Sequence, residues 1–186
     1  MKEDDYVEPA LAAAKEVLGH PLSIVRGAAL LYQVTVDNTL SLTVDPQHPK
    51  RGQSAFQTDL AVFEEVAKGV LIPRVVMEFK LSLTTHDVLT YSAKARKHKQ
   101  VYPYLRYGIV VGRELAMPGR FFTHNDGLDF GVAAASFKGN LQGLFRDLLS
   151  AEVETSRRLE AITFGKIAAH MFRTEVEVRK GGGKIR

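Results

Sequence analysis

The chain of 186 residues contains no cysteine. Disulfide bonds, thiolate zinc sites, iron–sulfur clusters and a cysteine nucleophile are therefore excluded. No apolar run approaches the roughly 18 residues of a membrane-spanning helix. The acidic residues at the start of the sequence lack the apolar core of a signal peptide. From these absences we expect a soluble, cytoplasmic protein that has no membrane partner.

Several common catalytic and cofactor motifs are also missing. The six histidines show no pair at zinc-ligand spacing, and the sequence has neither a GxSxG nor a GxGxxG pattern. Residues 181–184 read Gly-Gly-Gly-Lys, but a phosphate-binding loop would need a different leading spacing and a following Ser or Thr. We expect no organic cofactor, and we interpret residues 179–186 as a flexible, basic, glycine-rich tail.

The composition is that of an ordinary globular protein, with 45% hydrophobic and 25% charged residues. The length predicts one domain, which we assign to residues 1–178. Expected helices cover residues 9–18, 85–99 and 141–171; expected strands cover 30–36, 40–44, 56–66, 71–81, 105–111 and 174–178, with a hairpin over 121–133. This order predicts an α/β (α+β) fold with a central mixed β-sheet flanked by helices.

Charge is distributed unevenly, although the net formal charge is only +4. No acidic residue occurs between Val88 and Arg113. That stretch holds Lys94, Arg96, Lys97, His98, Lys99, Arg106 and Arg113, together with Tyr91, Tyr102, Tyr104 and Tyr107. Basic residues interleaved with aromatic ones suit a nucleic acid, which offers phosphates and bases that stack. A solvated helix followed by core tyrosines is an equally good interpretation of the same residues.

The expected strand over 71–81 carries an unusual pair of charges. Side chains alternate between the two faces of a strand, so Glu78 and Lys80 share one face while Met77 and Phe79 lie on the other. Charges on an otherwise apolar strand are costly unless they are paired or bind a metal. If the preceding strand forms a hairpin about Lys68-Gly69, its Asp59 falls nearly opposite Glu78.

Two carboxylates that converge on one sheet face can hold a hard divalent cation. Mg²⁺ takes one or two protein carboxylates and leaves its other positions to water and phosphate oxygens. A lysine beside such a site can act on the attacking water or neutralise charge on the phosphate. The set therefore supplies what phosphodiester hydrolysis requires.

Asp59, followed by Glu78-Phe79-Lys80, resembles the catalytic signature of the PD-(D/E)xK nucleases, which include most type II restriction endonucleases, Holliday-junction resolvases and several repair nucleases. In that family the two acids lie on adjacent antiparallel strands, and a helix and a further strand follow. Residues 56–112 match this order. The resemblance implies a restriction-endonuclease-like core, and that Asp59, Glu78 and the Phe79 backbone carbonyl bind Mg²⁺, for which Mn²⁺ can substitute. It gives Lys80 the role of acting on the water.

The sequence departs from the family pattern at one position, since Thr58 stands where the family's proline would be. Many members carry a further metal-shell carboxylate on the first helix, for which Glu16 is the candidate here and Glu8 the weaker one. Lys80 is the only lysine in the sequence that has an acid two positions before it. The alternative interpretation is a salt bridge on an edge strand between Glu78, Lys80 and their neighbours.

The leading hypothesis is a Mg²⁺-dependent DNA endonuclease of the restriction or defence type, acting as a homodimer because one site cuts one strand. The alternatives are a Holliday-junction resolvase or repair nuclease, and a catalytically inactive nucleic-acid-binding module of the same fold. We expect the DNA backbone to contact Lys94, Lys97 and His98 on the basic helix, and Lys50 and Arg51 in the loop before the strand of Asp59.

Overall fold

The computed structural model describes residues 4–137, 139–173 and 176–178. In chain order the elements are α1 (Asp4–Val17), β1 (Leu22–Arg26), β2 (Ala29–Leu31), β3 (Ala55–Gln57), β4 (Leu60–Ala67), β5 (Val70–Lys80), α2 (Thr85–Val101), β6 (Arg106–Val111), α3 (Gly119–His124), β7 (Phe130–Ala133), the 3-10 turn η1 (Ala134–Phe137) and α4 (Leu141–Thr163). The predicted tail over 179–186 and the predicted strand residues 174–175 lie outside the described residues.

A five-stranded sheet in the order β1-β4-β5-β6-β7 forms the centre of the fold. Strand β4 pairs antiparallel with both β1 and β5, whereas β5 pairs parallel with β6 and β6 parallel with β7. The expected mixed sheet with flanking helices is therefore confirmed. Strands β2 and β3 form a separate antiparallel pair beside it.

Two apolar clusters cover the two faces of the sheet. Helices α1 and α4 lie over one face, where Met77 and Phe79 of β5 pack against Phe145 and Leu149 of α4. Helices α2 and α3 lie over the other face, where Val76 of β5 belongs to the second cluster. Within the described residues, no helix is long and apolar enough to cross a membrane.

Helix α2 begins where the sequence predicts. The Thr84 side chain accepts a hydrogen bond from the backbone amide of Asp87, and the Asp87 carboxylate accepts one from the amide of Thr84. This reciprocal capping box satisfies two amides that the first turn of a helix leaves without partners. The cap fixes the start of α2 at Thr85, with four residues between it and the end of β5, so that the helix crosses the face on which Glu78 lies.

The N-terminal part of the fold differs from the expectation in three ways. Helix α1 begins at Asp4 rather than Pro9, because Tyr6, Val7 and Ala10 are buried and their packing outweighs the amide that the proline lacks. Strand β1 was not expected; it is a short edge strand of five residues whose side chains are half-buried or exposed. The strand predicted over 56–66 is divided into β3 and β4.

Thr58 explains this division. Its amide and its hydroxyl both donate to the carbonyl of Ala28, at 2.9 and 3.0 Å, and the carbonyl of Asp59 accepts from the amide of Gly27 at 3.0 Å. The backbone therefore leaves one strand partner, β2, and takes up another, β1, within two residues. Thr58 is buried, and these two hydrogen bonds give its amide and its hydroxyl the partner that buried polar groups require.

Three predictions for the C-terminal half are wrong. The hairpin over 121–133 is absent: Pro118 starts the short helix α3, which buries Phe121, and β7 pairs in parallel with β6. Helix α4 ends at Thr163, where Gly165 with φ of 67° turns the chain, and does not continue to residue 171. Residues 176–178 of the last expected strand are not in a strand.

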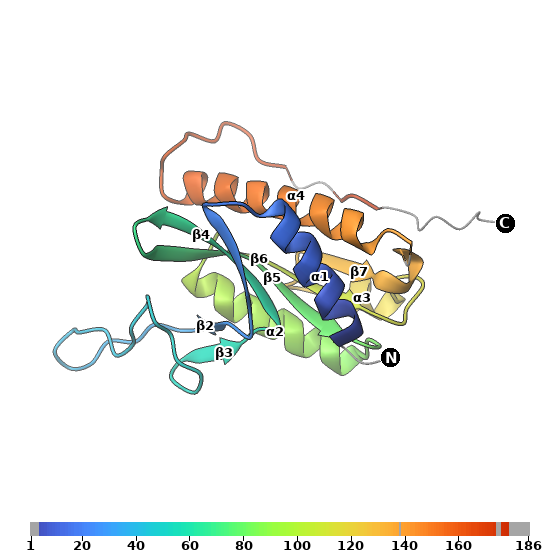
Figure 1. Ribbon diagram of the computed structural model, residues 1–186. Helices are drawn as coiled ribbons and strands as arrows, with labels where there is room; N and C mark the ends of the chain where they lie inside the picture. The colour runs from blue at the N-terminus through green and yellow to red at the C-terminus, as the bar shows by residue number, and fades with distance from the viewer. Residues whose placement is uncertain (1–3, 138, 174–175, 179–186) are drawn as a thin grey trace.

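Residues 32–54, which we call the arm, project away from the sheet between β2 and β3 (Figure 1). Of the strand expected at 30–36, Leu30 and Leu31 belong to β2. The remainder pairs with the strand expected at 40–44 only through an antiparallel bridge between Val36 and Leu42. The amide of Tyr32 donates to the carbonyl of Ser54 at 2.9 Å and so closes the base of the arm. The chain leaves the arm through β3 and reaches Asp59 two residues later.

Buried ion pairs attach α4 to the sheet. Arg74 of β5 is 3% exposed and donates to Glu64 of β4 and to Glu160 of α4, both at 2.6 Å. Arg157 of α4 also donates to Glu64 at 2.6 Å. Because both carboxylates have guanidinium partners, these ion pairs hold the C-terminal half of α4 against β4 and β5.

Candidate active site

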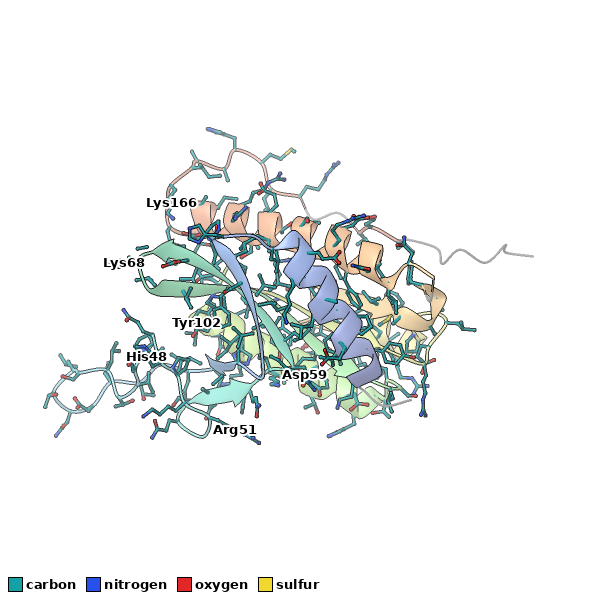
Figure 2. The ribbon with its side chains drawn as sticks, in the orientation of Figure 1. His48, Arg51, Asp59, Lys68, Tyr102 and Lys166 are labelled. Carbon is teal, nitrogen blue, oxygen red and sulfur yellow. The ribbon has the colours of Figure 1, made fainter. Side chains whose placement is uncertain are left out.

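Asp59 and Glu78 lie opposite one another on adjacent antiparallel strands. Leu60 of β4 pairs with Met77 of β5, so Asp59, the residue before Leu60, faces Glu78. The hairpin about Lys68-Gly69 has the register that the spacing predicts. Figure 2 shows Asp59 at one end of β4 and Lys68 at the other. The sheet therefore brings the two predicted acids together at its end beside the base of the arm.

Two backbone amides hold these acids in place. The amide of Phe79 donates to Oδ2 of Asp59 at 2.8 Å, and the amide of Asp59 donates to Oε2 of Glu78 at 3.3 Å. We call this reciprocal pair the amide clasp. It fixes both side chains to main chain rather than to flexible groups, which is the preorganisation that a binding or catalytic site requires.

Glu78 is buried, with 2% of its surface exposed. Its Oε1 accepts from the ammonium of Lys94 on α2, at 2.6 Å, and from the hydroxyl of Tyr107 on β6. Burial raises the pKa of Glu78, and the nearby charge of Asp59 raises it further, while Lys94 opposes both effects. Burial and the charge of Glu78 also raise the pKa of Tyr107 well above 10, so the phenol remains a donor.

Lys80 shares the α2 face with Glu78, as strand alternation predicts, and is half-buried. The ammonium groups of Lys80 and Lys94 each lie 5.6 Å from the centre of the Tyr91 ring. Burial and the charge of Glu78 raise the pKa of Tyr91, although a hydrogen bond with Lys80 acts in the opposite direction. The site thus combines two carboxylates with two ammonium groups around one aromatic ring.

The backbone carbonyl of Phe79 lies on the β4 side of β5. The carbonyl of Lys80 accepts from the amide of Gly112, on the β6 side of the strand. Successive carbonyls along a strand point to opposite edges. The carbonyl of Phe79 therefore points to the β4 edge, the same edge at which its amide meets Asp59.

The two acids and the main chain of Phe79 are the groups here that could hold a divalent cation. The Asp59 and Glu78 carboxylates and the Phe79 carbonyl are hard oxygen donors, the type that Mg²⁺ prefers, and Mg²⁺ keeps several waters when few protein ligands are present. Among the described residues, no group of three or more His, Cys, Asp or Glu side chains converges on one point. Any cation here would depend on two carboxylates and main chain.

Glu16 does not join this pair, and that prediction is wrong. The residue is exposed on the last turn of α1, and the chain then enters β1 at Leu22, which pairs with Glu64 far along β4 from Asp59. Glu8, the weaker candidate, lies at the correct end: it accepts from Arg26 at 2.9 Å, and Arg26 pairs with Leu60. The error arose because the direction of α1 could not be known from its sequence.

The close packing of α1 explains why its first half lies at the site end. A Cβ at Gly112, just after β6, would lie 2.2 Å from the ring of Tyr6. Only glycine permits that approach. Tyr6 is buried there, which sets the first two turns of α1 over the ends of β5 and β6.

The predicted phosphate-binding residues divide into two groups. Lys97 on α2 and Lys50 and Arg51 on the arm are exposed, and Arg51 also donates to the side chain of Gln57 at 2.9 Å. Figure 2 shows Arg51 on the arm beside β3. These three remain available to an external polyanion.

The other two residues of that prediction lie inward. His98 is fully buried: its Nδ1–H donates to the carbonyl of Leu31 at 2.8 Å, and its ring stacks on Tyr107 with centroids 5.7 Å apart. The prediction that it contacts phosphate is wrong. Lys94 is also directed into the fold, toward Glu78. Only the packing of α2 on the sheet and on β2 reveals which side of the helix faces inward.

Sequence reasoning missed Tyr91 and Tyr107 as members of the site. Tyr107 had a detectable sign, because a tyrosine in a strand covered on both faces needs a partner for its hydroxyl. Tyr91 precedes Lys94 by three residues and therefore lies on the same side of α2. Neither pattern identifies Glu78 as the partner without the three-dimensional arrangement.

Comparison with known proteins does not assign the chain to a family. No protein-family model matches the chain, and no curated protein sequence is similar to it.

Proposed function

We propose that the protein is a metal-dependent phosphodiester hydrolase that cleaves DNA, of the restriction or defence type. The observation that carries this proposal is the placement of Asp59 opposite Glu78 at the end of an antiparallel hairpin, with the amide clasp joining them and Lys80 on the same face. An edge-strand salt bridge, the alternative interpretation, is not favoured, because β5 lies at the centre of the sheet.

The arrangement of elements supports the same proposal. Strands β4 and β5 carry the acids on adjacent antiparallel strands, α2 follows β5, and β6 then pairs in parallel with β5. This is the order expected of the PD-(D/E)xK nucleases from the resemblance. Because no family model and no curated protein matches the chain, membership of that superfamily is also proposed.

In phosphodiester hydrolysis the residues would have the following roles. Asp59, Glu78 and the Phe79 carbonyl hold Mg²⁺, which when bound supplies Lewis-acid activation of water and phosphate. Lys80 holds a positive charge beside the phosphate, where negative charge develops during hydrolysis. Tyr107 orients Glu78 from the opposite side. Exposed Lys97, Lys50 and Arg51 bind the DNA backbone without reading its sequence.

Plasmid cleavage tests the proposal directly. Purified protein is incubated with supercoiled plasmid and Mg²⁺, with EDTA as the control. We expect nicked and linear products that EDTA suppresses. A Lys80→Met variant keeps the aliphatic part of the side chain and removes the ammonium, so it should lose cleavage while still binding Mn²⁺. Cleavage in EDTA, or full activity of Lys80→Met, would contradict the assignment.

A second candidate is a nucleic-acid-binding module of the same fold without catalysis. Both oxygens of Glu78 already accept hydrogen bonds, and no third acidic or histidine ligand joins Asp59 and Glu78 among the described residues. The two functions give different results: the binding module shifts DNA in a gel but leaves plasmid intact with Mg²⁺ or Mn²⁺. Adding a four-way junction to the substrates separates a resolvase or repair nuclease from a restriction-type enzyme.

For double-strand cleavage we propose a homodimer, because one site of this kind cuts one strand. Light scattering measures the mass of the protein in solution, and the ratio of linear to nicked plasmid at early times reports concerted cutting. A monomer that only nicks would remove the homodimer from the proposal and retain the hydrolase.

A further inference from the structure

We infer that Lys94 is a built-in competitor for the divalent cation: its ammonium occupies Glu78 in the metal-free protein and must be displaced or outcompeted when a cation binds. This inference rests on the proposed function, because it concerns the same site. In this role Lys94 controls the affinity of the site for the cation and does not bind DNA phosphate.

Lys94 contacts two oxygen acceptors, as a bound metal cation would. Its Nζ lies 2.6 Å from Oε1 of Glu78 and 2.8 Å from the backbone carbonyl of Gln57, both oxygen acceptors. Its side chain is 19% exposed, and that of Glu78 is 2% exposed. The ammonium therefore bridges a buried carboxylate and a main-chain carbonyl two residues before Asp59.

The pairing satisfies Glu78 in the absence of metal. A buried carboxylate without a partner costs several kcal/mol, and Lys94 supplies the missing opposite charge. The same charge repels a divalent cation that approaches Glu78 and Asp59. A lysine side chain is long and flexible, so its ammonium can leave Glu78 without moving α2.

Glu78 would keep its position when Lys94 leaves. The Tyr107 hydroxyl still donates to Oε1, and the Asp59 amide still donates to Oε2. Removing the ammonium therefore removes the competitor but not the ligand. A merely structural lysine would behave in the opposite way, because its loss would disorder the carboxylate and weaken cation binding.

Mn²⁺ titration followed by electron paramagnetic resonance, which measures the free ion, tests this inference without any measurement of cleavage. In Lys94→Met the ammonium is gone, and we expect Mn²⁺ to bind about tenfold more tightly than in the wild type, or about 1.4 kcal/mol. Lys94→Arg keeps the charge and should stay near the wild-type affinity. Lys68→Met, at the exposed turn of the hairpin far from Asp59, removes the same charge away from the site and should leave the Mn²⁺ affinity unchanged.

Thermal unfolding supplies a second readout. Lys94→Met should unfold at a lower temperature than the wild type without metal, because Glu78 loses its counter-ion. The same concentration of Mn²⁺ should then raise its unfolding temperature more than it raises that of the wild type. Lys94→Gln, which is neutral but can still donate to the carbonyl of Gln57, replaces Lys94→Met if the latter does not fold.

The outcomes distinguish this inference from the function. Equal or weaker Mn²⁺ binding by Lys94→Met and Lys94→Gln, with clear binding by the wild type, would overturn the competitor role and leave the hydrolase standing. Absence of Mn²⁺ binding in the wild type and in both neutral variants would overturn the metal site, and the competitor with it.

Discussion

Asp59 and Glu78 are joined through main chain: the amide of Asp59 donates to Glu78, and the amide of the residue after Glu78 donates to Asp59. Each acid is thus placed by the backbone that carries the other. A change in either side chain acts on both the charge of the site and the hydrogen bonding of the strands, and suitable substitutions separate these two effects.

Asp59→Asn and Asp59→Ala form such a pair. Asparagine keeps an oxygen that can accept from the amide of Phe79, so we expect Asp59→Asn to change the free energy of unfolding by no more than about 0.5 kcal/mol. Alanine leaves that amide without its acceptor and should cost about 1 kcal/mol more. Both should abolish cleavage. Urea unfolding and the plasmid assay measure the two quantities; an active Asp59→Asn would exclude the carboxylate as a ligand.

Tyr107→Phe removes one donor from the buried carboxylate of Glu78. Hydrogen bonds to charged groups contribute about 1.5–3 kcal/mol, so the variant should lose that much stability at neutral pH. Mn²⁺ binding should also weaken, since Glu78 is less well oriented. Tyr32→Phe is the control, because Tyr32 stacks on Phe56 outside the site. Wild-type stability of Tyr107→Phe would show that the hydroxyl does not support Glu78.

His98 makes stability depend on pH. Burial lowers the pKa of His98 from 6.5 to about 4. Among the described residues, its Nε2 has no hydrogen-bond partner, so a proton added there would have no acceptor. The folded state therefore resists protonation that the unfolded chain accepts, so stability is full above pH 6.5 and falls as the pH drops toward 4. The loss should approach about 3 kcal/mol.

His98→Phe keeps an aromatic ring beside Tyr107 and removes the titrating group. It should be less stable than the wild type at pH 7, because the carbonyl of Leu31 loses its donor, and this difference should shrink as the pH falls to 4.5. His170→Gln, at an exposed histidine, is the control. Urea unfolding at both pH values measures the effect, and a constant difference between wild type and His98→Phe would refute it.

The salt dependence of DNA affinity tests whether the exposed face of α2 contacts DNA. If Lys97 contacts DNA phosphate, Lys97→Ala should weaken binding to all duplex sequences alike and reduce the slope of log affinity against log salt by about 0.9. Lys68→Ala, at the turn of the hairpin far from Asp59 (Figure 2), removes the same charge and should leave the slope unchanged. Equal slopes for both variants and the wild type would move the DNA surface away from α2.

The parts of the site that depend on local periodicity could be predicted from the sequence. Strand alternation puts Glu78 and Lys80 on one face, and the symmetry of the hairpin brings Asp59 opposite Glu78. The capping residues Thr84 and Asp87 fix the start of α2. Each of these follows from contacts between residues close in the chain or across one tight turn.

The parts that depend on packing between distant elements could not be predicted. The side of α2 that faces inward is decided by the sheet and by β2, so the inward positions of Lys94 and His98 have no local sign. The parallel pairing of β7 with β6 likewise replaces the hairpin predicted over 121–133. The direction of α1, which separates Glu8 from Glu16, depends on the contact of Tyr6 with Gly112.

The closed base of the arm has a consequence for how the protein can change over time. Leu31 pairs with Ala55, and the amide of Tyr32 donates to the carbonyl of Ser54. The residues between them therefore form a loop whose two ends are held together. Insertions, deletions or wholesale replacement of residues 33–53 would leave the register of Asp59 untouched. Under the proposed function, variation in the arm therefore changes the contacts that Lys50 and Arg51 offer to DNA, while Asp59 keeps its place opposite Glu78.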